Sequence, residues 1–119
     1  MNRASAPLAA LALLLASVSV QAADNPVAGT WKLASFAFEG ATWTLTVKEQ
    51  NGKLSGKISG EYGEYPLDSA KLNGNTFTFR VYMGDDNIYD GEGKISGKSM
   101  QGVYLGPEGK GAFKGDKQP

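Results

Sequence analysis

One stretch, residues 42–60, constrains the fold of this chain more than any other; it reads TWTLTVKEQNGKLSGKISG. Apolar and polar side chains alternate in its first half, and the apolar ones are Trp43, Leu45 and Val47. Because successive side chains of a strand point to opposite faces of a sheet, this alternation predicts a half-buried strand. Asn51-Gly52 follows, and this dipeptide readily takes the positive φ values of a tight turn. The stretch therefore predicts a β-hairpin.

The same pattern of short strands and turns continues along the chain. Strands are predicted at residues 29–36 or 29–38, 42–50, 53–60, 65–69, 75–83, 88–96, 100–104 and 111–115. Turns are predicted at Glu39-Gly40, Asn51-Gly52, Gly60–Gly63, Asn73-Gly74, Gly84–Asn87, Gly97-Lys98 and Pro107–Gly109. In the fourth strand we expect Tyr65, Leu67 and Ser69 on the inward face. Residues 116–119 are expected to fray, as chain ends commonly do.

Eight short strands with no room for a helix between any two define an all-β chain. We predict an antiparallel up-and-down meander of about eight short strands closed into a small barrel. The glycines fit this fold, because Gly56, Gly91, Gly93 and Gly102 fall on the predicted buried face and permit the coiling of a small closed sheet. A sandwich of six or seven strands is the alternative if the sheet edges stay open.

Residues 1–22 match the pattern of a secretory signal peptide. Arg3 supplies one positive charge, residues 8–16 are apolar, and Val20-Gln21-Ala22 provides the exit. The apolar run is shorter than the roughly 20 residues that a transmembrane helix needs. We therefore predict cleavage after Ala22, a single β-barrel domain at residues 23–119, and a periplasmic or secreted location.

Composition excludes several classes of function. Removing 22 of the 119 residues removes one charge and leaves 11 basic and 12 acidic side chains, so bulk charge favours neither nucleic acid nor an anionic membrane as a partner. We expect no stable membrane insertion after signal cleavage. The chain has no His and no Cys, which removes the commonest general base, the commonest zinc ligand and the nucleophilic Cys–His and Ser–His–Asp arrangements. We therefore expect no enzyme activity, no metal and no cofactor.

Gly29-Thr30-Trp31, followed by an eight-strand meander, resembles the start of the calycin superfamily, which includes lipocalins and avidins. In those families the tryptophan of Gly-x-Trp lies in the first strand and closes one end of the barrel. The order Gly-x-Trp, hairpin, Leu54-Ser55-Gly56-Lys57 is similar to that of avidins. Trp43 is the one other tryptophan and a disulfide is impossible, so the resemblance implies neither biotin nor a large lipid as ligand. Small periplasmic inhibitors of secreted proteases also begin with a similar Gly-x-Trp.

The candidate ligand-binding residues are large aromatic side chains expected in the barrel interior or at its mouth. They are Trp31, Trp43, Phe77, Phe79, Tyr89 and Tyr104. An eight-stranded barrel either fills its interior with side chains or holds one small ligand, and this many inward aromatics favour filling. A small apolar pocket at one mouth is the corresponding binding hypothesis.

The densest cluster of charge has an ordinary explanation beside a functional one. Its members are Asp85, Asp86, Asp90 and Glu92. Carboxylates on a short loop can bind calcium, but their spacing differs from that of an EF-hand loop. Asp, Asn and Gly are common turn residues, so a solvated hairpin turn is the favoured interpretation.

Two further polar features have both a functional and an ordinary interpretation. A possible rim at one barrel mouth comprises Glu61, Tyr62, Glu64 and Tyr65. Paired carboxylates can act in glycoside hydrolysis, but nothing here fixes their separation, so a soluble turn is favoured. Arg80 lies on an outward face, where we expect it to pair with an acid across the strands or to stack on Tyr82.

Two functions of different classes remain open from the sequence. The first is non-catalytic binding of a small apolar ligand by the inward aromatics. The second is a protein-binding module, such as an inhibitor of a secreted hydrolase, that acts through its loops or through the leader at residues 23–28.

Overall fold

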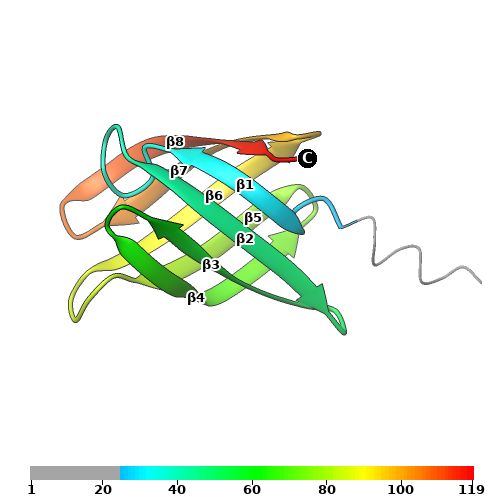
Figure 1. The fold of residues 1–119 in the computed structure, drawn as a ribbon, viewed down its shortest axis with the longest axis horizontal. Helices are drawn as coiled ribbons and strands as arrows, with labels where there is room; N and C mark the ends of the chain where they lie inside the picture. Colours follow the sequence, from blue (N-terminus) through cyan, green and yellow to red (C-terminus); the bar gives the residue numbers. More distant parts are fainter. Residues whose placement is uncertain (1–24) are drawn as a thin grey trace, which may run out of the picture.

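The computed structural model describes residues 25–119, so the predicted signal peptide and its cleavage point lie outside the described residues. Eight strands follow one another: β1 (Gly29–Ala34), β2 (Thr42–Gln50), β3 (Lys53–Gly60), β4 (Gly63–Asn73), β5 (Thr76–Tyr82), β6 (Ile88–Ser96), β7 (Ser99–Gly106) and β8 (Gly109–Lys117). Each pairs antiparallel with its neighbours in sequence, and together they form one closed barrel (Figure 1). The predicted all-β meander closed into a small barrel is confirmed.

The barrel closes where its first and last strands meet. Trp31 to Ala34 of β1 pair in register with Lys117 to Lys114 of β8. The backbone N–H of Gln118 then donates to the carbonyl oxygen of Thr30 (2.8 Å). The expectation that the chain frays from residue 116 was therefore wrong, because these last residues complete the ladder to β1.

Tight turns form at the Asn and Gly residues, with one shift from the predicted position. Asn51-Gly52 links β2 to β3, and both residues have positive φ (55° and 80°). This matches a type I′ turn, whose twist suits two antiparallel strands. Asn73 still belongs to β4, so the loop to β5 is Gly74-Asn75 and the glycine takes the positive φ of 65°.

β4 contains a bulge that the sequence interpretation missed. Its register against β5 shifts between Leu67 and Ser69, so Asp68 is an extra residue in the strand. Beyond the bulge, Ala70 and Leu72 pack against the core. The expectation that Ser69 faces inward was wrong, because an extra residue reverses the faces of all side chains that follow it.

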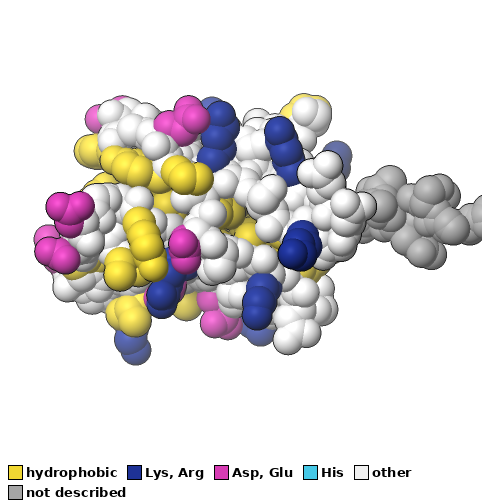
Figure 2. Space-filling model, turned by 90° about the horizontal axis from the view of Figure 1, so that it is seen from below, with side chains coloured by type: hydrophobic (Ala, Val, Ile, Leu, Met, Phe, Trp, Pro, Cys, Tyr) yellow, Lys and Arg dark blue, Asp and Glu magenta, His cyan; other side chains and the backbone are white. Residues whose placement is uncertain are grey.

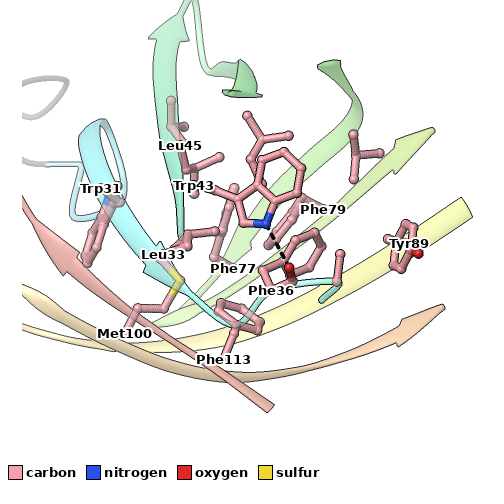
Figure 3. Close-up of a cluster of buried hydrophobic side chains, with 14 of the residues drawn as sticks. Trp31, Leu33, Phe36, Trp43, Leu45, Phe77, Phe79, Tyr89, Met100 and Phe113 are labelled. Atoms are coloured by element: carbon pink, nitrogen blue, oxygen red, sulfur yellow. Dashed lines mark hydrogen bonds between the residues drawn. The ribbon is translucent and has the colours of Figure 1, made fainter. Parts of the chain in front are cut away.

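Large apolar side chains fill the barrel interior (Figure 3). The largest fully buried ones include Trp31, Trp43, Phe36, Phe77, Leu33, Leu45, Ile58 and Met100. Glycines on neighbouring strands make room for the rings. Phe79, for example, is paired with Gly91, where an added Cβ would overlap the phenyl ring. The interior of this barrel is therefore a packed core.

One end of the barrel is closed by a loop residue. β1 ends at Ala34 rather than at the predicted residue 36 or 38, because Ser35 and Ala37 take positive φ (69° each) and turn the chain inward. Phe36 between them is fully buried. Its carbonyl oxygen accepts a hydrogen bond from Nε1 of Trp43 (2.8 Å; Figure 3).

The other end is closed by the segment before β1. Val27 is fully buried, and its carbonyl oxygen accepts a hydrogen bond from Nε1 of Trp31 (2.9 Å). The backbone N–H of Val27 donates to Oδ1 of Asn25 (2.9 Å), which fixes the segment in place. The tryptophan of Gly-Thr-Trp thus lies in β1 at a closed end of the barrel.

Candidate functional site

The two ends of the barrel differ in charge, because alternate loops of an up-and-down meander lie at the same end. Loops 35–41, 61–62, 83–87 and 107–108 form one end, hereafter the acidic end. Their charged residues are Glu39, Glu61, Asp85, Asp86 and Glu108, with no Lys or Arg among them. This concentration of carboxylates arises from loops that are far apart in the sequence.

The opposite end, hereafter the lysine end, is formed by turns 51–52, 74–75 and 97–98 and by residues 25–28. Lys98 is the one charged residue of its three turns. Within three positions of these turns lie one acid, Glu49, and four lysines: Lys48, Lys53, Lys71 and Lys94. On the face in Figure 2, acidic side chains gather toward the left edge, whereas lysines spread mainly over the right-hand part. The barrel is therefore electrically polar along its length.

Exposed apolar side chains gather at the acidic end as well. In residues 25–119, the large apolar side chains that remain exposed are Phe38, Tyr62, Tyr82, Ile88, Val103 and Leu105. Two lie within acidic-end loops, two flank loop 83–87, and one precedes loop 107–108 by two positions; Val103 is farther from the loops on β7. Figure 2 shows hydrophobic side chains gathered on this half of the visible face. Apolar surface next to a polar rim is typical of a binding site.

Aromatic rings connect this exposed surface to the core. The ring of Phe38 lies 4.9 Å from that of Tyr62, 5.9 Å from that of Tyr89 and 6.3 Å from that of Trp43, centre to centre. These separations fall in the range of favourable aromatic pairs. The hydroxyl of Tyr65 donates to the carbonyl oxygen of Tyr62 (2.8 Å), which ties loop 61–62 to β4. The acidic end thus presents aromatic rings held from below.

The loop that carries Phe38 is strained and held by its own hydrogen bonds. Ala37 is the centre of a γ-turn in which the N–H of Phe38 donates to the carbonyl oxygen of Phe36 (2.7 Å). A γ-turn with positive φ is rare, and a non-glycine residue there costs about 1–3 kcal/mol. The N–H of Gly40 donates to Oγ of Ser35 (3.0 Å) and closes the loop from the other side. Strain of this kind concentrates at functional sites.

A shallow groove of about 270 Å³ lies at this mouth. Its aromatic walls are Phe38, Tyr89 and Tyr104, and its carboxylates are Glu39 and Glu108. Burial raises the pKa of the Tyr89 hydroxyl above its ordinary value, and the charges of Glu108 and Tyr104 raise it further. The Tyr89 phenol is therefore neutral at physiological pH, and the groove combines aromatic walls with two carboxylates and one ammonium group, that of Lys110.

A second groove, of about 520 Å³, runs over the outer face of β4 to β8 beside the acidic end. Arg80 lies in it and holds Asp90 with two hydrogen bonds, Nε to Oδ1 (2.7 Å) and Nη2 to Oδ2 (3.0 Å). The bond to Asp90 raises the pKa of Arg80 above its ordinary value. Val103 and Leu105 provide its apolar surface. The expected pairing of Arg80 with an acid across the strands is thus present.

The six residues predicted to bind a ligand separate into two groups. Four of them, Trp31, Trp43, Phe77 and Phe79, are at most 3% exposed and form part of the packed core. Tyr89 and Tyr104 lie at the acidic end and line the groove there. Of the six, Tyr89 and Tyr104 line the groove at this mouth, and Phe79 also borders the 520 Å³ groove on the outer face.

The predicted charge features have these positions. Asp85 and Asp86 are exposed in loop 83–87, whereas Asp90 is held by Arg80 in the neighbouring strand. No group of three or more acidic side chains in residues 25–119 could hold a metal ion. The predicted polar rim does lie at a mouth: Glu61 is exposed in loop 61–62, and Glu64 pairs with Lys57 (3.0 Å).

The sequence interpretation missed two residues of loop 35–41. It did not predict that Phe36 closes one end of the barrel, nor that Phe38 is exposed there. A signal was present: apolar side chains at Trp31 and Leu33 fall on odd positions, and those at 36 and 38 on even ones. This change of phase indicates that the strand stops between them. The acidic end could also have been found by collecting the charges of alternate turns.

Searches against family models, curated proteins and solved structures gave no significant match. Residues 25–119 include no helix with the length and apolar character needed to cross a membrane.

Proposed function

We propose that this protein is an exported, non-catalytic, calycin-like barrel that binds a basic protein partner through its acidic end. One observation carries the proposal: the exposed large apolar side chains gather at the end whose loops hold five carboxylates and no Lys or Arg. An apolar centre supplies affinity through burial, and charges at the rim steer and select the partner. A surface with apolar contacts and a Lys/Arg rim is the chemistry that matches.

The packed interior favours binding at the surface over binding inside. Trp31, Trp43, Phe77 and Phe79 occupy the space that a lipocalin-type ligand would need. The strained loop 35–41 instead holds Phe38 at the surface from a buried anchor, Phe36. A rigid aromatic presented in this way loses little conformational entropy on binding. The residues therefore support recognition by loops, as in a protein-binding module.

Export of the protein rests on the predicted signal peptide at residues 1–22, and membership of the calycin superfamily on Gly29-Thr30-Trp31. A closed eight-strand meander and a tryptophan at a closed end of β1 are compatible with that superfamily. A secreted hydrolase with a basic surface is one partner of the proposed chemistry, and the protein is then its inhibitor.

A panel of purified secreted hydrolases with basic and acidic isoelectric points tests the proposal. The barrel is tethered at residue 119, which lies at the lysine end, and binding is measured by interferometry at several salt concentrations. We expect capture of basic members only, with affinity that falls as salt rises. Asp85→Lys with Asp86→Lys should weaken binding by about tenfold or more.

The control reverses two charges of the opposite sign at the other end: Lys53→Glu with Lys71→Glu, both exposed. This variant adds negative charge away from the acidic end and should bind a basic partner at least as tightly as the wild type does. Equal loss of binding in both variants, or capture of acidic hydrolases as well as basic ones, would contradict the proposal.

The 270 Å³ groove supports a second candidate, a small amphipathic ligand bound at the mouth. Phe38, Tyr89 and Tyr104 offer apolar contact, and the carboxylates of Glu39 and Glu108 outnumber the one ammonium group of the lining, Lys110, and so favour a cationic ligand. A thermal-shift screen with benzylamine and toluene tests it, since a ligand that binds only the folded state raises Tm. A benzylamine shift that keeps its full size in Phe38→Ala would count against this site.

A further inference from the structure

A pocket distinct from the two grooves described above lies in the barrel wall at the lysine end, where β3 and β4 separate. The register between these strands covers four pairs, from Gly60↔Gly63 to Lys57↔Pro66. Beyond them, Lys53 to Gly56 of β3 and Leu67 to Asn73 of β4 are not register partners of each other. The bulge at Asp68 lies at the start of the part of β4 that pairs with β5 but not with β3. A pocket of about 720 Å³ opens between the two strands.

The lining of this pocket combines three apolar side chains and one carboxylate with polar residues, namely Asn25, Lys53, Ser69, Lys71 and Asn73. Leu54, Ala70 and Leu72 line it and also pack against the core. Glu49 of β2 lines it too, two positions after the buried Val47 and therefore on the inward face of its strand. The pocket is thus continuous with the apolar interior.

Glu49 stands out electrostatically. Its Oε1 atom is buried and has no hydrogen-bond partner, and no other buried side-chain nitrogen or oxygen in residues 25–119 is in that state. The ion pairs formed by these residues join Lys57 to Glu64 and Arg80 to Asp90, so none involves Glu49. A buried carboxylate oxygen that has gained no donor costs free energy relative to a hydrated one. Because Oε1 is closed off from water, a donor in the pocket reaches it only when the carboxylate turns about its last side-chain bond, and a cationic donor would then relieve this state.

Two exposed lysines, Lys53 and Lys71, also line the pocket. Their positive charge opposes the entry of any cation, and a bare, strongly hydrated metal ion would bring no apolar surface to offset the repulsion. An organic cation differs, because its hydrocarbon part can cover Leu54, Ala70 and Leu72. The unpartnered oxygen of Glu49 and the apolar side chains together therefore favour an organic cation over a bare metal ion.

We propose that this pocket, the amine pocket, binds a small primary amine with an apolar body. The ammonium group contacts the Glu49 carboxylate and the hydrocarbon lies against Leu54, Ala70 and Leu72. The site is independent of the acidic end, since the two share no lining residue and lie at opposite ends of the barrel. Experiments can therefore refute the proposed partner binding without refuting the amine pocket, and they can refute the amine pocket without refuting partner binding.

Calorimetric titration of the folded barrel with hexylamine, 1-hexanol and hexanoate tests the proposal. The three probes share a hydrocarbon chain and differ in the head group. We expect hexylamine to bind with one-site saturation and about tenfold or more tighter than the other two, as one charge-assisted hydrogen bond allows. Equal affinity for the three probes, tighter binding of hexanoate, or no binding of hexylamine would overturn it.

Two variants locate the site. Glu49→Gln removes the charge with little change of shape and should lower hexylamine affinity to that of 1-hexanol, whereas Glu64→Gln, an exposed carboxylate near the acidic end, should leave it unchanged. Ala70→Leu narrows the pocket and should weaken both probes. If Glu49→Gln binds hexylamine within about twofold of wild type, the assignment is wrong.

Carbon-detected NMR of the wild-type barrel keeps the test decisive if a variant fails to fold. Hexylamine should shift the Glu49 carboxylate resonance more than any other carboxylate in residues 25–119. A largest shift at Glu39 or Glu108 would place the amine in the other groove and overturn the proposal.

Discussion

The two ends of this barrel are closed by the same device and present opposite surfaces. At each end a core tryptophan donates its indole N–H to the carbonyl oxygen of a buried residue outside the strands: Trp43 to Phe36 at the acidic end, and Trp31 to Val27 at the lysine end. Closure of a barrel end thus needs one buried side chain and one indole donor. Neither end needs exposed apolar surface for this closure, so the concentration of carboxylates and apolar side chains at the acidic end calls for another explanation, and we propose binding.

The largest expected difference between the ends comes from their buried anchors. Phe36 lies against four rings, those of Phe79, Tyr89, Tyr104 and Phe113, at 5.1–6.1 Å between centres. Phe36→Ala should destabilise the fold by about 3–5 kcal/mol, because a large cavity remains in a packed core. Val27→Ala removes far less volume and should cost about 1.5–2 kcal/mol.

Urea unfolding monitored by tryptophan fluorescence measures both changes. Partner binding should fall in Phe36→Ala, whose loop loses its anchor, and persist in Val27→Ala. Equal destabilisation by the two substitutions would show that the ends are anchored equally, against this comparison.

The indole donors should give a smaller and more symmetrical effect. Trp43→Phe leaves the carbonyl oxygen of Phe36 buried without its donor, and Trp31→Phe does the same at Val27. Each substitution should destabilise by about 1–3 kcal/mol from the unpaired carbonyl, with further loss from the smaller ring. Hydrogen exchange should increase at loop 35–41 in the first variant and at residues 25–28 in the second. Exchange that rises at the same residues in both variants would contradict separate closure of the two ends.

Alkaline pH should act on the acidic end through Tyr89. Burial is the chief cause that raises the pKa of its hydroxyl in the folded protein above the ordinary value. The folded state then holds this proton more tightly than the unfolded state, so stability is complete below the unfolded pKa and falls as pH rises through the folded one. Tyr89→Phe should lose less stability than wild type when urea unfolding is repeated from about pH 9 to about pH 11. The exposed Tyr82→Phe is the control and should follow the wild type.

The smallest effect on stability is expected from the ion pair beside the acidic end. Arg80 and Asp90 are more than two-fifths exposed, so Asp90→Ala should unfold within experimental error of wild type. It nevertheless leaves the Arg80 guanidinium unpaired next to the proposed binding surface. Affinity for a basic partner should therefore fall, while Glu64→Ala, which breaks the Lys57–Glu64 pair, tests whether loss of any exposed carboxylate has the same effect. A similar loss of partner affinity in Asp90→Ala and Glu64→Ala would show that the effect comes from the net charge of the protein and not from the unpaired Arg80.

The strand pattern was readable from the sequence because burial on one face imposes a period of two. Trp43, Leu45 and Val47 face inward as predicted, and Asn51-Gly52 forms the expected turn. The same rule fails where an extra residue or a loop changes the phase. Asp68 inserts one residue into β4, and the loop after Ala34 carries Phe36 into the core from outside the strands.

The candidate sites were harder to predict, for a different reason. Tyr89 and Tyr104 were expected among the interior aromatics, and their position at a mouth depends on where the barrel ends relative to each strand. Glu49 alternates with Val47 and could be placed inward, but its lack of a partner depends on the separation of β3 from β4. Local pattern determines which face a side chain takes, whereas its neighbours follow from the register of strands distant in sequence.

The meeting of β1 and β8 has a kinetic consequence. Each other interface of the barrel joins strands that are consecutive in the chain, and such hairpins can form within about 1–10 μs. The β1–β8 interface joins residues 31–34 to residues 114–117, so nearly the whole domain must be ordered, against its loop entropy, before these pairs form. Until then β1 and β8 are open edges that can pair with other chains. We therefore expect the pairing of β1 with β8 to limit the folding rate. We also expect aggregation to begin before these two strands have paired.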